Sequence, residues 1–371
     1  MTKSETVIRE LLDTADIKVN GSNPWDMQVH DDRLYDRILS DSSLGLGEAY
    51  VEGWWDSDSI DEFINRVLKA RLDEKIKKNI RLIFQVLRAD IINRQSSTRA
   101  FEVGIKHYDL GNDLYKAMLD KRLNYTCGYW KNAQNLDEAQ EAKLELVCKK
   151  IGIYPGMRIL ELGCGWGSFA KYAAEKYNAS VLGVTVSKEQ VALGTELCKG
   201  LPVELHLQDY REVNGTFDAV ISIGMMEHVG YKNYSEYMQV VDKCLKPDGI
   251  GFIHTIGGNI SITTGDPWTD KYIFPNAMVP SISQIGKAME GRFVMEDWQN
   301  FGPNYDPTLM VWHANFENAW PELKKNYDEH FYRMWRYYLL SSAGEFRARS
   351  QELWHIVFTR QGTIQPNCRF S

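Results

Sequence analysis

The chain has 371 residues, of which 44% are hydrophobic and 25% charged, as is typical of a globular protein with one large core and room for a smaller unit. Its formal net charge of −7 argues against general nucleic-acid binding, for which a basic domain is expected. No apolar segment resembles a secretory signal or approaches the ~18–20 residues of a membrane span, so we expect a cytoplasmic protein.

The first part of the chain is predicted to be mostly helical. Apolar residues recur at helical spacing in three segments, 5–15, 31–41 and 59–73. The glycine-containing stretch 42–56 (SSLGLGEAYVEGWWD) indicates a break between them. Polar residues near 93–100 favour a linker. We therefore expect a helical amino-terminal domain over 1–92, a linker over 93–106 and a larger domain over 107–371.

Residues 66–106 form a distinctly basic segment in this acidic chain. They contain eleven Lys or Arg against four Asp or Glu. Apolar residues stand at helical spacing within the segment, namely Ile76, Ile80, Ile83, Phe84, Leu87 and Ile91. A helix that packs its apolar stripe on the protein explains this pattern, and so does a surface that docks on anionic lipid headgroups. The sequence leaves both interpretations open.

From about residue 137, helices alternate with short apolar strands. Five strands are predicted at 157–164, 180–187, 203–209, 217–224 and 249–257. Two more, at 292–302 and 353–360, flank a long helical region over 308–344. This alternation is typical of βαβ units and a parallel sheet. The predicted fold is α/β: a doubly wound, Rossmann-like, mostly parallel sheet of seven strands with helical additions.

The six cysteines are scattered, without CxxC or Cys/His ligand spacing. This pattern indicates reduced, mostly buried thiols and no metal site.

A glycine turn follows the first strand of this region, in the sequence ILELGCGWGSFA (159–170). Glycines let the backbone approach a ligand closely, and the dinucleotide fingerprint GxGxxG uses them to hold a pyrophosphate. Here the pattern is GxGxG at Gly163, Gly165 and Gly167, preceded by the acid Glu161. A carboxylate repels a pyrophosphate but attracts an ammonium group. The turn is therefore typical of class I methyltransferases and predicts S-adenosylmethionine as the cofactor.

Two further strand ends favour the same cofactor. Asp209 ends the third strand, where its carboxylate can accept a hydrogen bond from the adenine amino group. Many methyltransferases carry an acid for the ribose after the second strand, but this chain has Thr185 at that place. We expect the nearby Gln190 to bind the ribose hydroxyls instead.

Beyond these features the chain resembles the cyclopropane-fatty-acyl-phospholipid synthases. The resemblance rests on motifs spread over nearly the whole chain: SLGLGEAYVEGWW (43–55), HYDLGNDLYKAMLD (107–120), YTCGYW (125–130), ELGCGWG (161–167), GVTVSKEQ (183–190), GMMEHVG (224–230), HTIG (254–257), DPWTDKYIFP (266–275), NFGPNYDPTL (300–309) and AGEFRARSQELW (343–354). Because the amino-terminal region takes part, the resemblance favours the full-length bacterial enzymes over their shorter mycolic-acid relatives.

The resemblance implies a specific reaction. A cis double bond in an unsaturated acyl chain of a membrane phospholipid receives the methyl carbon of S-adenosylmethionine. The resulting carbocation loses a proton to a bound bicarbonate, and the cyclopropane ring closes. The resemblance also implies a homodimer. The basic stretch and apolar helices of the amino-terminal region suit binding to lipid headgroups or the bilayer surface, so we expect peripheral association with the inner face of the membrane.

The resemblance further implies which residues form the two sites. Five would hold bicarbonate: Glu227, His254 and Tyr305 by their side chains, and Cys127 and Ile256 by backbone N–H groups. Eight would bind S-adenosylmethionine: Tyr108, Glu161, Gly163, Gly165, Trp166, Gln190, Asp209 and Tyr210. Aromatic residues at the matched motifs are candidates to stabilise a carbocation, namely Tyr129, Trp130, Tyr272, Phe274, Phe301 and Tyr305.

Without the resemblance, other interpretations stand. Glu227 by itself would be a candidate general base, and a lone His254 on an apolar strand is more often a satisfied core residue. The same fold also suits a C-methyltransferase that makes methyl-branched acyl chains, or a non-catalytic module that binds lipid or S-adenosylmethionine. One departure from the family is Ser341–Ser342, where relatives often carry a cysteine. The mechanism needs no covalent nucleophile, so we expect this difference to be tolerated.

Overall fold

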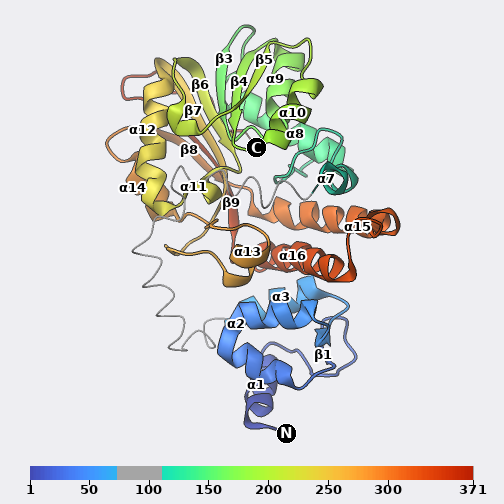
Figure 1. Cartoon of the computed structure of the whole chain (residues 1–371). Coiled ribbons are helices and arrows are strands. Elements are labelled where there is room, and N and C mark those ends of the chain that lie inside the picture. The colour runs from blue at the N-terminus through green and yellow to red at the C-terminus, as the bar shows by residue number, and fades with distance from the viewer. Residues whose placement is uncertain (73–110, 371) are drawn as a thin grey trace. The chain divides into compact units, whose positions relative to one another are not determined.

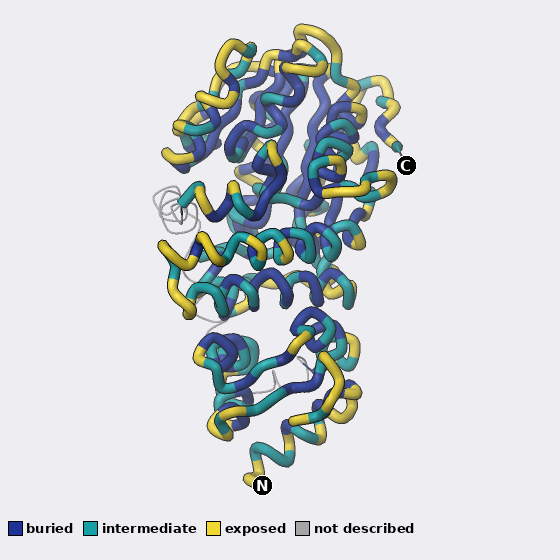
Figure 2. The backbone as a smooth tube through the Cα atoms, turned by 90° about the vertical axis from the view of Figure 1, so that its right-hand side faces the viewer, coloured by how far each residue is buried: buried dark blue, intermediate teal, exposed yellow. Residues whose placement is uncertain are grey.

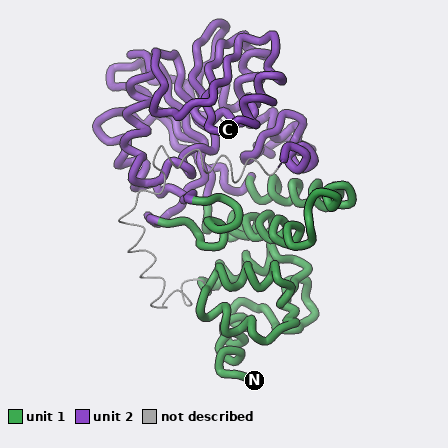
Figure 3. The backbone as a smooth tube through the Cα atoms, in the orientation of Figure 1, with its two compact units in different colours: residues 1–92, 264–275, 305–351 green, residues 93–263, 276–304, 352–371 purple. Residues whose placement is uncertain are grey.

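The computed structural model describes residues 1–72 and 111–370. The chain forms two compact units that alternate along the sequence (Figure 3). Unit 1 comprises residues 1–92, 264–275 and 305–351, and unit 2 comprises residues 93–263, 276–304 and 352–371. The sequence-based scheme did not include the two returns of the chain to unit 1. The linker expected over 93–106 lies outside the described residues, and the domain boundaries stay a prediction.

Unit 2 is built on a seven-stranded sheet (Figure 1). Its strands are β3 Arg158–Leu162, β4 Ser180–Thr185, β5 Val203–Leu207, β6 Phe217–Ile223, β7 Leu245–Gly257, β8 Val294–Asn300 and β9 Glu352–Thr359. The spatial order is β5-β4-β3-β6-β7-β9-β8. The first five strands pair in parallel, and β9 is antiparallel to both its neighbours. The mostly parallel α/β sheet predicted from the sequence is confirmed.

Helices cover both faces of this sheet. They are α7 Asn112–Met118, α8 Leu136–Lys150, α9 Ser168–Tyr177, α10 Lys188–Leu197, α11 Met226–Val229, α12 Tyr234–Cys244 and α14 Ile282–Met289, with 3₁₀ turns η1 Tyr210–Glu212, η2 Tyr231–Asn233 and η3 Gly302–Asn304. In Figure 1, α12 and α14 lie on one side of the strands and α8 and α9 on the other.

The alternation of side chains along each strand explains this layering. On β3, Leu160 and Leu162 belong to a core cluster shared with α12 and α14, whereas Ile159 belongs to a cluster shared with α8 and α9. On β6, Val220 faces the first cluster and Ile221 the second. Because successive strand residues point to opposite faces, a strand with apolar residues at successive positions supplies two cores at once. Strands β3, β4, β6, β7 and β9 are accordingly mostly buried in Figure 2, whereas the edge strands β5 and β8 are largely exposed or half-buried.

One strand begins earlier than predicted. β7 begins at Leu245 rather than Gly249, because Leu245 already pairs with Phe217 of β6 before a bulge. The preceding helix α12 correspondingly ends at Cys244.

Unit 1 is mostly helical. Its helices are α1 Lys3–Asp13, α2 Arg33–Val51, α3 Ile60–Lys69, α13 Pro267–Tyr272, α15 Tyr305–Leu323 and α16 Glu329–Arg347, with a two-stranded sheet of β1 Gln28–Val29 and β2 Trp55–Asp56. Helix α16 packs against α2, α3 and α15. The sequence predicted helical segments at the places of α1, α2, α3, α15 and α16, but it did not predict α13 or the small sheet.

The break predicted over 42–56 is confirmed at Ser42 and after Val51, but it is wrong for residues 43–51, which are helical. Helix α2 continues to Val51, with a kink at Ser42, whose φ of 53° and ψ of −127° are not helical. Gly45 and Gly47 serve close packing, whereas Gly53, with a φ of 76° and no heavy atom within 4 Å of an added Cβ, serves the turn after the helix. A Cβ on Gly47 would lie 2.4 Å from Trp268 Cδ1, so only glycine admits the indole at this point.

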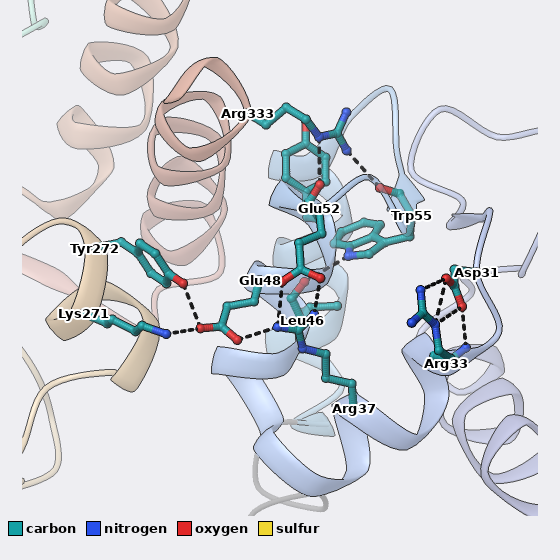
Figure 4. Close-up of polar contacts among 11 residues, drawn as sticks. Asp31, Arg33, Arg37, Leu46, Glu48, Glu52, Trp55, Lys271, Tyr272 and Arg333 are labelled. Carbon is teal, nitrogen blue, oxygen red and sulfur yellow. Dashed lines mark hydrogen bonds and ion pairs between the residues drawn. The ribbon is translucent and has the colours of Figure 1, made fainter. Parts of the chain in front are cut away.

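Glu48 ties α2 to α13 within unit 1 (Figure 4). Its carboxylate accepts hydrogen bonds from Lys271 Nζ at 2.5 Å, the Tyr272 hydroxyl at 2.8 Å and Arg37 Nη2 at 2.6 Å. Burial raises the pKa of Glu48, but these donors outweigh it and hold that pKa below its usual value. The returning segment 264–275 is thus fastened to the amino-terminal helices by charge as well as by packing.

No helix among residues 1–72 and 111–370 is long and apolar enough to cross a membrane. All six cysteines are buried and free of disulfides, as expected from their spacing.

Candidate active site

The glycine turn after β3 requires glycine at each of its three positions. Gly163, Gly165 and Gly167 have φ of 76°, 54° and 78°, a region that disfavours residues with a side chain. A Cβ on Gly163 would lie 2.7 Å from Met225 Sδ, whereas a Cβ on Gly165 would have no heavy atom within 4 Å. The open space beside Gly165 is part of a cavity that this glycine lines.

This cavity lies at the carboxyl ends of β3, β4 and β6, entirely within unit 2. Seven of the eight residues predicted to bind S-adenosylmethionine line it: Glu161, Gly163, Gly165, Trp166, Gln190, Asp209 and Tyr210. The eighth, Tyr108, lies outside the described residues. Ligands of open α/β sheets bind at this edge of the strands, so the predicted set forms one coherent site.

Glu161 is the buried acid of the cavity. Its residue is 3% exposed, and its Oε2 has no hydrogen-bond partner among the described residues. Burial raises the pKa of Glu161 to about 8, and the positive charge of Lys143 partly opposes this effect. A buried carboxyl oxygen with an unmet hydrogen bond fits an ammonium group, which donates up to three.

Gln190 lies where the sequence expects the ribose. Its Oε1 accepts a hydrogen bond of 2.7 Å from the Thr185 hydroxyl, and both residues are buried. Thr185, which replaces the usual acid, thus fixes the orientation of Gln190. The carboxamide NH₂ group then points away from Thr185 and can donate.

Asp209 and Tyr210 lie together at the η1 turn after β5. Asp209 Oδ2 pairs with Arg211 Nη1 at 2.9 Å, and its Oδ1 accepts from the Arg211 backbone N–H at 2.9 Å. A carboxylate has about four acceptor positions, so these bonds leave capacity for an adenine amino group. The Tyr210 hydroxyl is buried without a partner among the described residues.

Lys143 is a cavity residue that the sequence analysis missed. It lies on α8, is 2% exposed, and its Nζ donates to Asn124 Oδ1 at 3.0 Å and Thr126 Oγ1 at 2.9 Å. Burial lowers the pKa of Lys143 to about 8. One turn earlier, Gln140 Nε2 donates to the Thr126 carbonyl at 2.7 Å. Helix α8 therefore holds the loop that lines one wall of the cavity.

A signal for Lys143 was present in the sequence. Leu136, Ala139, Lys143, Val147 and Lys150 recur at spacings of three and four residues along α8, and all are buried. Lysines on an apolar helical stripe must find polar partners inside the protein. Lys150 does so in an ion pair of 2.6 Å with Asp297 of β8.

Glu227 lies on the short helix α11, directly after β6. Its Oε1 accepts a hydrogen bond of 2.6 Å from the Ile256 backbone N–H, and its Oε2 has no partner among the described residues. The Ile256 N–H that the resemblance assigns to bicarbonate is thus engaged by Glu227. Burial raises the pKa of Glu227 to about 7. Met225 and His228, on either side, line the cofactor cavity.

His254 lies on β7, two residues before Ile256, whose N–H group binds Glu227. Its ring pairs with that of a second histidine. His254 Nδ1 lies 2.9 Å from Nε2 of His355 on β9, and the two residues are 1% and 2% exposed. Burial holds the pKa of each ring well below its usual value, and neighbouring positive charge adds to the effect. His254 Nε2 has no partner among the described residues.

The remaining predicted residues are divided between the units. Cys127 is buried in unit 2, and its thiol donates to the Gly128 carbonyl at 3.2 Å. Tyr305 is the first residue of α15 in unit 1. Its ring packs against that of Phe346, with the ring centroids 4.5 Å apart. Of the predicted aromatic residues, Tyr129 and Phe301 meet edge to face in unit 2 with their ring centroids 5.5 Å apart.

Residues 95–356 match the family described as mycolic acid cyclopropane synthetase. The chain is 50% identical over 354 residues to the cyclopropane-fatty-acyl-phospholipid synthase of Escherichia coli K12, covering 95% of this chain and 93% of that protein. It is 35% identical over 341 residues to a probable fatty acid methyltransferase of Pseudomonas putida, covering 86% and 82%.

The fold is also similar to that of a solved cyclopropane synthase structure. The crystal structure of mycolic acid cyclopropane synthase CmaA1 complexed with SAH and CTAB has 28% sequence identity and a TM-score of 0.65, covering 70% of this chain and 98% of that one. Together with the glycine turn and its cavity, these matches show that the chain belongs to the cyclopropane synthase family of S-adenosylmethionine-dependent methyltransferases, with the phospholipid-modifying synthases among its relatives.

Proposed function

We propose that this protein converts a cis double bond of an unsaturated acyl chain in membrane phospholipids into a cyclopropane ring. The observation that carries this proposal is the arrangement at the ends of β6 and β7. There, Glu227 Oε2 and His254 Nε2 are buried and have no hydrogen-bond partner among the described residues. Glu227 also lies between Met225 and His228, which line the cofactor cavity. The proposal is supported by the E. coli relative, whose name gives this activity.

S-adenosylmethionine supplies the methyl carbon as a sulfonium. The unmet Oε2 of Glu161 and the open space beside Gly165 support its binding in the cavity. We assign Gln190 to the ribose hydroxyls, and Asp209 and Tyr210 to the adenine. The CmaA1 structure, which was solved as a complex with SAH, supports a cofactor of this class for the present chain. An alkene is a weak nucleophile, so these residues must orient the methyl group and exclude water from it.

A base must then remove a proton from the former methyl group. Bicarbonate, when bound, would supply an acceptor oxygen for that proton. His254 Nε2 is buried, lacks a described partner and can donate to such an anion. Glu227, whose pKa burial raises to about 7, can stand next to an anion in its protonated form. Tyr305 and the backbone N–H groups of Cys127 and Ile256 complete the set assigned from the family resemblance, although the Ile256 N–H donates to Glu227 Oε1 in the structure.

The carbocation that precedes ring closure has no heteroatom of its own to stabilise it. Aromatic faces attract positive charge. We assign the stabilisation of the carbocation to Tyr129 and Phe301, which are in edge-to-face contact within unit 2.

The basic segment 66–106 supports peripheral binding to an anionic membrane surface, since eleven Lys or Arg outnumber four acids there. We assign the lipid side to the helical amino-terminal region and propose a homodimer at the inner face of the membrane. Activity on phosphatidylglycerol vesicles should then fall steeply with added salt and with neutral lipid. Insensitivity to both would refute the membrane part of the proposal.

The activity is tested with unsaturated phospholipid vesicles and methyl-labelled S-adenosylmethionine, followed by lipid mass spectrometry. Cyclopropanation adds one CH₂ and removes the double bond, so the labelled product resists ozonolysis. A product heavier by CH₄ would instead show methylation with reduction, as in a methyl-branched chain. Binding of S-adenosylmethionine without release of S-adenosylhomocysteine would point to a non-catalytic module.

A further inference from the structure

His355 contacts the proposed base site through a single hydrogen bond. Strands β7 and β9 are antiparallel, and their register places His254 directly opposite His355. The nitrogens His254 Nδ1 and His355 Nε2 lie 2.9 Å apart, and the ring planes are inclined by 43°. At this distance one nitrogen carries the hydrogen and the other accepts it.

The pair is neutral in charge. Desolvation lowers the pKa of both rings, and the positive charge of Lys143 opposes protonation of each; His355 also feels its partner ring and Lys150. A neutral imidazole has one N–H and one bare nitrogen. Two arrangements of the pair are therefore possible, and they differ in what His254 presents at Nε2.

In the first arrangement His254 Nδ1–H donates to His355, and His254 Nε2 is a bare lone pair. That lone pair would repel the oxygen of an anion, while His355 Nδ1–H would remain a buried donor without a described acceptor. In the second arrangement His355 Nε2–H donates to His254 Nδ1, and His254 Nε2 carries the hydrogen. An anion then satisfies that donor and leaves only a bare acceptor at His355 Nδ1. An unmet buried donor is costly, so the bound anion selects the second arrangement.

We propose that His355 is a positioning residue that fixes His254 as the Nε2–H tautomer, and thereby makes it a hydrogen-bond donor to the anion rather than a base. This inference rests on the proposed function, which assigns His254 to bicarbonate. The bond between the two rings allows either tautomer; the bound anion selects the one with the hydrogen on His254 Nε2, and the Nε2–H group of His355 then holds it by donating to His254 Nδ1.

The surroundings of His355 keep its ring in place. Its centroid lies 4.3 Å from that of Phe301 and 5.1 Å from that of Phe252, the latter nearly edge to face. Phe301 also contacts Tyr129. The ring is thus fixed by strand register on one side and by aromatic packing on the other, as a positioning role requires.

The first test reads the tautomer of the full-length wild-type protein in the presence of saturating bicarbonate. Long-range ¹H–¹⁵N spectra of protein labelled in its histidine rings separate the two tautomers, and the signal of His254 is identified by its loss in H254Q. We expect the hydrogen on Nε2. A hydrogen on Nδ1 would overturn the inference, whatever the activity measurements show.

The second test measures the dependence of activity on bicarbonate in buffers free of carbon dioxide. H355L removes the N–H donor, and we expect its KM for bicarbonate to rise about 10- to 100-fold, with the KM for S-adenosylmethionine unchanged. H355Q restores an N–H near the Nε2 position and should return the bicarbonate KM to within a few-fold of wild type. H206Q, which changes an exposed histidine on β5, is the control.

The outcomes separate the inference from the function on which it rests. An unchanged bicarbonate KM in folded H355L, or equal loss in H355L and H355Q, would refute the positioning role. If the activity of the wild type and of every variant is independent of bicarbonate, the proposal that bicarbonate is the base is refuted. The spectra of the wild type then still decide the tautomer of His254.

Discussion

The carboxylate of Glu227 accepts a hydrogen bond of 2.6 Å from the backbone N–H of Ile256. This contact joins α11 to β7 and places a carboxyl group in the interior with one strong donor. Burial raises the pKa of Glu227 from 4.5 to about 7, and the Ile256 N–H only partly offsets it. The ionised form of this residue is therefore costly in the folded protein.

A pH-dependent stability follows for E227Q. The folded-state pKa of Glu227 lies above its unfolded value, so the wild type loses stability as the pH rises from about 4.5 through about 7. Glutamine does not ionise. We expect E227Q and wild type to unfold with equal free energy at pH 4.5, and E227Q to be more stable by up to about 3 kcal/mol at pH 8. Urea unfolding at a series of pH values measures this difference.

The control is E204Q, which changes an exposed glutamate on β5. Its stability difference from wild type should stay near zero over the whole pH range. Equal curves for E227Q and wild type would mean that the carboxyl is solvated, contrary to its burial.

The cofactor cavity gives a second prediction through a matched pair of glycines. Gly165 and Gly152 have similar positive φ of 54° and 60°, and a Cβ on either meets no atom within 4 Å. Alanine therefore costs both sites a similar backbone strain, about 1–2 kcal/mol. Only Gly165 lines the cavity.

We expect G165A to weaken S-adenosylmethionine binding at least tenfold, because its methyl group occupies space that the ligand needs. G152A should bind as tightly as wild type. Isothermal titration with S-adenosylhomocysteine measures both affinities. Equal affinities for the two variants would place the ligand away from the glycine turn.

Much of the cofactor site could be predicted from the sequence because it is local. Glu161, Gly163 and Gly165 stand within five residues, and the turn between a buried strand and a helix fixes their relation. Lys143 was missed because pattern analysis assigns lysine to solvent. Its role depends on Asn124 and Thr126, which a loop brings back to α8 only in the folded protein.

Lys143 provides a third prediction. K143M retains about the same side-chain length but removes the ammonium group. The loop that carries Asn124 and Thr126 therefore loses both of its hydrogen bonds to Lys143. We expect the KM for S-adenosylmethionine to rise about tenfold, as for the loss of hydrogen bonds to a charged group. K149M, which changes a lysine that is 53% exposed on the same helix, should behave as wild type. A normal KM in K143M would show that the loop holds its position without the lysine.

The fold of unit 2 follows from the sequence more fully than that of unit 1. Apolar runs such as residues 181–184 predict strands directly, and their alternation with helices predicts a parallel sheet. The association of 264–275 with the amino-terminal helices has no such local signature. It depends on individual contacts between distant segments, such as Glu48 with Lys271 and Gly47 with Trp268.

The contact between Gly47 and Trp268 gives the last prediction. In an isolated helix, alanine is favoured over glycine by about 1 kcal/mol. In α2, however, a Cβ on Gly47 would lie 2.4 Å from Trp268 Cδ1 and 2.6 Å from its Nε1, so the indole must move. Overpacking of this kind costs about 1–3 kcal/mol, which exceeds the gain in helix propensity. We therefore expect G47A to lower the free energy of unfolding.

Gly286 is the matched control because it also lies within a helix, α14, but a Cβ there meets nothing within 4 Å. G286A should be neutral or stabilise the protein by up to about 1 kcal/mol. Urea unfolding followed by circular dichroism and tryptophan fluorescence compares the two variants. If G47A were as stable as G286A, the glycine would not be required for packing. The stretch 42–56 would then owe its glycines to some other constraint than the close approach of Trp268.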